Sequence, residues 1–395
     1  MRLILTAISI FLIPFLIGPT SVAKAQDGES NVDSTFEYVF GKELRFILSA
    51  DHASEVERIT LLFRPELSSE MYIVNVPFEP GENLSVTHPV NVSMIKLKPY
   101  SQVTYSWQID TDKGSWKVPE QSFAYEDDQF DWKQMTRAGA TVHWTENGPS
   151  FGHDVLNVVD DALLPLSKVL PLENISPFDI YVYPSSADLR AAVALAGLDS
   201  EKISHPDLGV ILVTAVNPQS AVSDLGQSIP YELAQLLIYR LAGEEYADFP
   251  WWLAEGLGTA FLSRPNPRSS QIVDEAISAE ATIPLRHLCK APVEEGDSAV
   301  LARAQSLSMV EYIRTTYGDQ RLSDLVRSYS QGIECQSGVQ HTLGLTLDQL
   351  EAEWLDSHLS PSLPTRLTND FGLWILIILA GFGFSLILIR YSTRG

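Results

Sequence analysis

Two short segments carry side chains that can do chemistry. The first, 230–235, reads Pro-Tyr-Glu-Leu-Ala-Gln, and the second, Trp-Trp-Leu-Ala-Glu-Gly-Leu, contains Glu255. In a helix, Tyr231 and Gln235 lie four positions apart and share one face, with Glu232 beside them. Pro230 begins the first segment and Pro250 directly precedes the second, and proline suits the first turn of a helix. We therefore expect two adjacent helices that present two carboxylates, a phenol and an amide.

This layout resembles the gluzincin metallopeptidases, and in particular the peptidase MA-like domains of bacterial cell-surface proteins. In that family the first helix reads His-Glu-x-x-His and the second Trp-Leu-x-Glu-Gly-Leu. The resemblance implies that the two histidines and the second-helix glutamate bind zinc, while the first-helix glutamate activates the zinc-bound water. Here Glu232 occupies the general-base position and Glu255 the third ligand position.

The two histidine positions of the family hold Tyr231 and Gln235 instead. Zinc needs imidazole or thiolate donors at about 2.0–2.3 Å, and a glutamine amide is a poor ligand. A tyrosine must first lose a proton whose reference pKa is about 10. The nearest other histidines, His205 and His287, do not lie at helix positions that can substitute. We expect no bound metal, and so no acidified water for Glu232 to activate.

The resemblance covers most of the chain between its two ends and implies an α+β domain over residues 135–360. Further matching segments are Tyr125-Glu126-Asp127, Ala304-Gln305-Ser306, Tyr317-Gly318, Leu350-Glu351-Ala352-Glu353-Trp354 and both cysteines. The hydrophobic pattern independently predicts strands first and helices later, which is typical of α+β domains. Predicted strands are 141–144, 178–183 and 209–215. Predicted helices are 153–169, one opening at Ser185, 230–242, 250–263, 297–316, 320–330 and 347–358, the last with a Thr346/Gln349 capping box.

Residues 31–126 alternate with period two and contain no helical stretch. Short β-type runs occur at 44–48, 59–63, 71–76, 94–97, 103–109 and 122–125. Six or seven short strands separated by turn residues predict an immunoglobulin-like or fibronectin-like sandwich. The acidic run 126–128 marks the domain boundary, and we interpret it as a solvated linker.

Both ends of the sequence carry export and membrane signals. Residues 1–25 have a positive start, an apolar run and an Ala-Lys-Ala site, which is typical of a signal peptide. Residues 371–389 contain no charge and measure about 28 Å as a helix, enough to span a bilayer. Two arginines in the tail, 390–395, predict a cytoplasmic C-terminus. We expect a single-pass cell-membrane protein with an extracytoplasmic N-terminus.

Only two cysteines occur, Cys289 and Cys335, and both lie in the part predicted to be exported. In an oxidising compartment such a pair favours a disulfide. Metal binding by two widely spaced thiols without histidine partners is the weaker alternative.

The composition excludes some classes of function. The chain has 27 Lys and Arg against 50 Asp and Glu, a net charge of −23, so nucleic acid is not an expected partner. A hydrophobic content of 45% indicates folded domains rather than disorder.

Three functional hypotheses follow. The first is a membrane-anchored, non-catalytic metallopeptidase homologue that binds an unidentified protein or peptide. The second is an active zinc-dependent peptidase with an atypical ligand set, and the third is a cell-surface adhesion or assembly module that works through the sandwich. Glycosidase chemistry needs two carboxylates at a defined separation across a sugar ring, and no feature of the sequence points to it.

Overall fold

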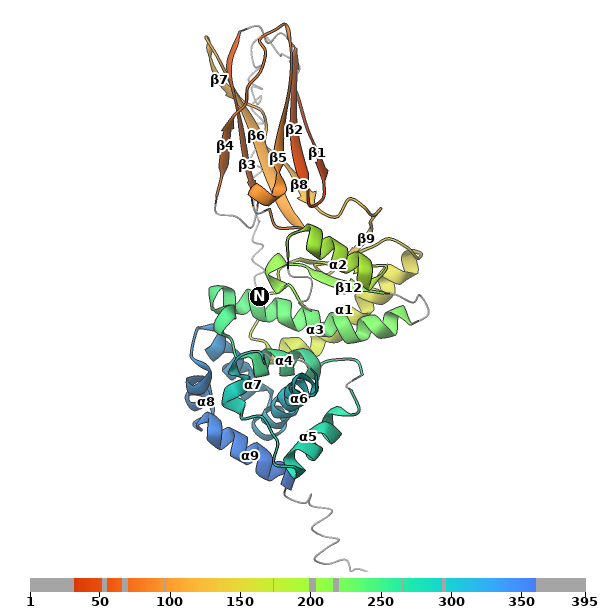
Figure 1. The fold of residues 1–395 in the computed structure, drawn as a ribbon, viewed down its shortest axis with the longest axis vertical. Coiled ribbons are helices and arrows are strands. Elements are labelled where there is room, and N and C mark those ends of the chain that lie inside the picture. The colour runs from red at the N-terminus through yellow and green to blue at the C-terminus, as the bar shows by residue number, and fades with distance from the viewer. Residues whose placement is uncertain are drawn as a thin grey trace, which may run out of the picture.

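The structure is a computed structural model in which a β-sandwich stands on a second domain made of a small sheet and a stack of helices (Figure 1). It describes residues 32–51, 55–65, 70–95, 97–172, 174–198, 204–215, 220–264, 266–292 and 296–359. The predicted signal peptide, membrane span and tail lie outside these residues. Within the described ranges, no helix is long and apolar enough to cross a membrane.

The N-terminal domain consists of two antiparallel sheets, which confirms the β-rich region expected from the period-two pattern. The first sheet has the order β1 (Val32–Val39), β2 (Glu43–Asp51), β5 (Asn83–Asn91). The second has the order β4 (Tyr72–Asn75), β3 (Val56–Pro65), β6 (Ser101–Thr111), β7 (Gly114–Lys117), with β8 (Gln121–Tyr125) also paired to β6. Strand β6 thus lies at the centre of its sheet. Strand β3 pairs with one side of it, and β7 and β8 pair with different parts of the other side.

Alternate residues of the strands fill one core between the two sheets. Phe46 on β2 meets Phe63 on β3 with ring centroids 5.1 Å apart. The fully buried Trp107 on β6 donates its indole N–H to Ser34 Oγ of the opposite sheet at 3.1 Å. This bond removes the cost of burying an unpaired donor, so Trp107 packs in the core rather than forming a binding platform.

The predictions missed three strands of this domain and placed one strand wrongly. Strands β1, β5 and β7 lie in segments for which no strand was predicted, and Met94, Ile95 and Leu97 of the predicted run 94–97 do not lie in a strand. Instead, a 3-10 turn, η1 (Val92–Met94), follows β5. The Asn91 side chain accepts a hydrogen bond from Ser93 N at 3.0 Å, and this local cap competes with extended pairing.

The second domain begins with a four-stranded sheet of order β12-β11-β10-β9. Its strands are β9 (Lys133–Arg137), β10 (Ala140–Trp144), β11 (Phe178–Tyr183) and β12 (Ile211–Thr214). Strands β10, β11 and β12 are parallel, and β9 pairs antiparallel to β10. Helix α1 (Pro149–Val169) connects β10 to β11, and α2 (Ser186–Leu195) with the turn η2 (Pro206–Leu208) connects β11 to β12.

Strand β11 joins the two hydrophobic cores. Ile180 and Val182 pack in the core of the second domain, while Tyr181 and Tyr183 point to the other face and join the core of the sandwich. Because successive strand residues alternate between faces, one strand supplies both domains. The two domains therefore share a packed, apolar junction.

The acidic run 126–128 is not the solvated linker that the sequence suggested. Asp127 is fully buried and accepts a hydrogen bond from the Tyr183 hydroxyl at 3.2 Å. Glu126 accepts one from the Tyr181 hydroxyl at 2.8 Å. Charge patterning alone could not reveal this, because the donors come from a strand more than fifty positions away.

The remainder of the domain is helical. The helices are α3 (Ala221–Ala242), α4 (Trp251–Ala260), α5 (Ser269–Ser278), α6 (Asp297–Tyr317), α7 (Asp319–Ser330), α8 (Cys335–Leu343) and α9 (Leu347–Leu359), with 3-10 turns η3 (Gly243–Asp248) and η4 (Leu285–Cys289). Helices α5 and α8 were not predicted. The capping box of α9 is present: Gln349 N donates to Thr346 Oγ1 at 3.1 Å, and Thr346 N donates to Gln349 Oε1 at 2.8 Å.

Helix α3 starts nine positions before Pro230, which lies inside the helix rather than in its first turn. Buried Leu225 and Ile229 extend the apolar face of Leu233 toward the N-terminus. Packing of this face against α1 outweighs the hydrogen bond that the proline removes. Pro250, in contrast, is the cap residue directly before α4.

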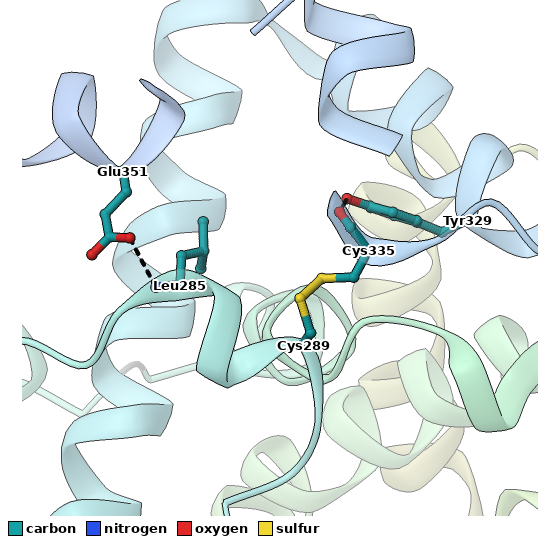
Figure 2. The surroundings of a disulfide bond; sticks show 5 residues. All are labelled: Leu285, Cys289, Tyr329, Cys335 and Glu351. Atoms are coloured by element: carbon teal, nitrogen blue, oxygen red, sulfur yellow. Dashed lines mark hydrogen bonds between the residues drawn. A yellow bond between two sulfur atoms is a disulfide. The ribbon is translucent and has the colours of Figure 1, made fainter. Parts of the chain in front are cut away.

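The expected disulfide joins Cys289 at the end of η4 to Cys335 at the start of α8 (Figure 2). Glu351 accepts a hydrogen bond from Leu285 N at 2.9 Å, and the Tyr329 hydroxyl donates to Cys335 O at 2.7 Å. The segment carrying η4 is thus attached to α8 and α9 at both of its ends.

Replacing both cysteines by serine should destabilise the domain. The bridged residues are 46 positions apart, so the lost constraint on the unfolded chain corresponds to about 4 kcal/mol in the chain-entropy model. Denaturant unfolding measures the difference. Reductant should bring the wild-type protein to the stability of the Cys289→Ser/Cys335→Ser variant and leave the variant unchanged; equal stability of oxidised wild type and variant contradicts the prediction.

Candidate functional site

The four residues singled out from the sequence meet where α3 packs against α4. Glu232, Gln235 and Glu255 are 8%, 5% and 4% exposed, so this is a buried polar group between two helices. Tyr231 lies beside them, partly exposed. The one-turn spacing of Tyr231 and Gln235 on α3 directs both side chains toward α4, as the sequence predicts.

Tyr231 and Glu255 are joined directly. The Tyr231 hydroxyl donates to Glu255 Oε2 at 2.8 Å, and the Arg303 guanidinium from α6 lies 3.5 Å from Glu255 Oε1. Burial raises the pKa of Glu255, while the bond from Tyr231 and the charge of Arg303 oppose this. Burial and the adjacent Glu255 charge raise the pKa of Tyr231 far above its ordinary value. The phenol therefore keeps its proton and acts as a donor.

Gln235 uses both ends of its amide. Its Nε2 donates to Ala254 O at 3.1 Å, and its Oε1 accepts from the Tyr246 hydroxyl at 3.1 Å. The side chain thus ties α3 to α4 and to η3. An amide engaged in this way has no free oxygen directed at a ligand.

Glu232 points to a different partner. Its Oε2 accepts a 2.5 Å hydrogen bond from Ser204 Oγ, at the start of the segment that leads into η2. Burial raises the pKa of Glu232 to about 8; the Ser204 bond opposes this shift, and the Glu255 charge adds to it. The carboxyl is therefore largely protonated at neutral pH and ties the η2 segment to α3.

Gly258 on α4 makes room for the side chains of α3. A β-carbon at this position would lie 2.7 Å from Tyr231 Cδ2 and 3.2 Å from Gln235 Nε2. Because Gly258 has no side chain, the ring of Tyr231 fits between α3 and α4.

A cleft of about 860 Å³ opens above these residues. Four partly exposed aromatic side chains line it: Tyr231, Tyr239, Tyr246 and Trp251. The basic residues Lys290 and Arg303 and the acidic residues Asp207 and Glu255 also line it, together with Cys289 of the disulfide. The volume is that of a typical ligand site rather than a packing defect.

The donor set at the family's zinc position does not fit zinc. One candidate ligand is a protonated phenol, the second is an amide with both ends engaged, and the third, Glu255, already has two partners. Across the described ranges, no group of three or more His, Cys, Asp and Glu side chains is placed to hold a metal ion. The arrangement instead makes a hydrogen-bonded floor for the cleft.

Sequence reasoning missed three side chains that contact this floor. Arg303, Ser204 and Tyr246 come from α6, the η2 segment and η3, and each contacts a residue that the motif did identify. Arg303 directly precedes the matched Ala304-Gln305-Ser306 segment, which is a signal that could have drawn attention to it. Nothing in the local sequence marks Ser204 or Tyr246.

The comparisons with known proteins agree with this geometry. The family model of the Peptidase MA superfamily matches residues 158–359, just over half of the chain. The protein therefore belongs to the peptidase MA superfamily. A search of curated proteins finds no match.

A search of solved structures finds similar chains of low sequence identity. An M1 zinc metallopeptidase from Deinococcus radiodurans is 13% identical over 84% of this chain and 95% of its own, with a TM-score of 0.37. A family 56 carbohydrate-binding module, a β-1,3-glucan binding domain, is 7% identical over 24% of this chain and 99% of its own, with a TM-score of 0.17.

Substituting Glu232 should change how stability depends on pH. The pKa of Glu232 rises from 4.5 to about 8 on folding, so its contribution is fully present below about pH 4.5 and is lost as pH rises through 8. Wild-type stability should therefore fall between pH 5 and 9, and Glu232→Gln should flatten that fall. Denaturant unfolding across this range tests the prediction, with exposed Glu311→Gln on α6 as control; equal slopes for wild type and Glu232→Gln contradict it.

Proposed function

We propose that this protein is a non-catalytic member of the peptidase MA superfamily that binds a protein or peptide in the cleft between α3, α4 and α6. In this proposal the chain is exported, is anchored in the cell membrane by residues 371–389, and works without a metal. The observation that carries the proposal is the Tyr231–Glu255–Arg303 contact, in which a phenol and a guanidinium occupy both oxygens of the remaining family ligand.

The chemistry of the floor supports this function over peptide hydrolysis. Hydrolysis in this family relies on water acidified by zinc, and neither a protonated phenol nor a fully engaged amide replaces the two imidazoles. Glu232, at the general-base position, carries a proton at neutral pH and is bonded to Ser204. A protonated carboxyl cannot accept a proton from water.

The cleft itself supports a binding role. It keeps a volume of about 860 Å³ and an aromatic lining although the donor set is not suited to zinc. Aromatic side chains of this kind supply large contact areas at low conformational cost. The disulfide stabilises one wall, which favours a preformed site.

Restoring the two histidines tests this proposal. If the helices have kept the family's geometry, Tyr231→His with Gln235→His should bring zinc binding to about one equivalent, because two imidazoles and Glu255 then make a normal three-ligand site. Metal content after dialysis against zinc and removal of the excess measures this. Adding Glu255→Gln to the double variant is the matched control and should lower the bound zinc again.

The wild-type protein provides the decisive comparison. Purified full-length wild type should hold no stoichiometric zinc and should leave casein uncleaved. Near-stoichiometric zinc in the wild type, with casein cleavage that stops on adding chelator or on Glu232→Gln, would overturn the proposal in favour of an active peptidase with an atypical ligand set.

A further inference from the structure

The acidic side chains that line the cleft are already compensated within the protein. Asp207 on one wall has its own cation, because Lys98 Nζ of the sandwich domain lies 3.6 Å from Asp207 Oδ2 and donates to Asp207 O at 3.1 Å. Glu255 is buried in the floor, where it is bonded to Tyr231 and paired with Arg303 Nε. The acidic residues of the lining therefore offer little negative charge to a ligand.

Both basic residues of the lining are exposed to solvent. The Arg303 side chain is 47% exposed, and its recorded ion pair uses only Nε at a long 3.5 Å. Lys290 is exposed, and no ion pair to it is found among the described residues. A guanidinium with its outer nitrogens available is well suited to bind a carboxylate through two parallel hydrogen bonds.

The exposed positive charge of the cleft contrasts with the net charge of the whole protein. With a net charge of −23, most of its surface repels anions. A cleft that nevertheless presents Lys290 and the outer nitrogens of Arg303 beside an aromatic wall is complementary to a ligand that combines a carboxylate with a bulky apolar group.

We propose that the cleft binds acidic peptide segments, in which a glutamate or aspartate side chain contacts Arg303 and Lys290 while an adjacent aromatic residue packs on Tyr239, Tyr246 and Trp251. This inference rests on the proposed function and names the class of peptide that the site selects. It involves no covalent step.

The position of Lys290 gives the site a rigid second anchor. Lys290 directly follows disulfide-bonded Cys289, at the end of the η4 segment. Ile283, which precedes η4 in the sequence, is held by the buried Gln305 side-chain amide. This amide accepts a hydrogen bond from Ile283 N at 3.0 Å and donates one to Ile283 O at 2.5 Å. Arg303 lies two positions before Gln305 on α6. The same helix thus supplies one cation and holds the segment that carries the other.

Three matched peptides test the proposal. The first peptide is fluorescein-labelled Gly-Ser-Glu-Phe-Glu-Ser-Gly, blocked at both ends. In the second peptide both glutamates are replaced by glutamine, and in the third both are replaced by lysine. Fluorescence anisotropy with the full-length protein in detergent should give a Kd for the acidic peptide about tenfold or more below that for the glutamine peptide, as expected for a charge-assisted hydrogen bond. Binding of the acidic peptide should weaken as salt increases.

Variants assign the effect to the cleft. Arg303→Gln and Lys290→Gln should each remove most of the preference for the acidic peptide, and Arg303→Lys should restore part of it. Lys117→Gln, an exposed lysine on β7 of the sandwich, carries the same charge change and should have no effect. Thermal unfolding of each variant establishes that it is folded.

The two possible failures differ in outcome. Equal affinity for all three peptides overturns the preference for acidic segments and leaves peptide binding in place. Absence of binding to any of them overturns this inference together with the proposed binding role. An acidic preference that survives Arg303→Gln/Lys290→Gln places the anion site elsewhere and also overturns the inference.

Discussion

A carboxylate buried between two helices needs hydrogen-bonding or ionic partners. The partners of Glu255 determine the arrangement of the whole site. One oxygen accepts the Tyr231 hydroxyl and the other faces the Arg303 guanidinium. Removing either partner would leave a buried charge poorly compensated, a large cost compared with the stability of a domain. In the metallopeptidases that the sequence resembles, zinc meets this need. Here a protein donor and a protein cation meet it, so the floor is satisfied without a ligand.

The cleft persists above that floor because its walls are held independently of it. The η4 segment is attached by the Cys289–Cys335 bridge, by Glu351 and by the buried Gln305 amide. On the opposite side, Ser204 is tied to Glu232. These contacts come from α3, α6, α8 and α9, which share one hydrophobic core. The side chains at the family's two histidine positions therefore set the chemistry of the floor, while the walls maintain the space above it.

The sandwich contributes to the same site through the junction. Tyr181 and Tyr183 of β11 pack into its core and donate to Glu126 and Asp127, so the first domain is bonded to the sheet that supports the cleft. Lys98 of the sandwich reaches Asp207 on the cleft wall. A junction of this kind orients the sandwich relative to the cleft, and it also neutralises an acid that would otherwise repel an anionic ligand.

The sequence alone determined the order of the two domains, the helices that carry the motif, the pairing of the cysteines and the identities at the family's ligand positions. Those features depend on local periodicity or on residue identity, which a single chain displays directly. Tertiary structure decided the rest. Helix α3 runs through Pro230 because distant packing outweighs one lost hydrogen bond, and Asp127 of the acidic run is buried where the tyrosines of β11 bond to the run. The partners of Glu232 and Glu255, Ser204 and Arg303, are also long-range neighbours. Burial and hydrogen-bond partners are properties of the folded chain, and they convert a degenerate motif into a defined floor.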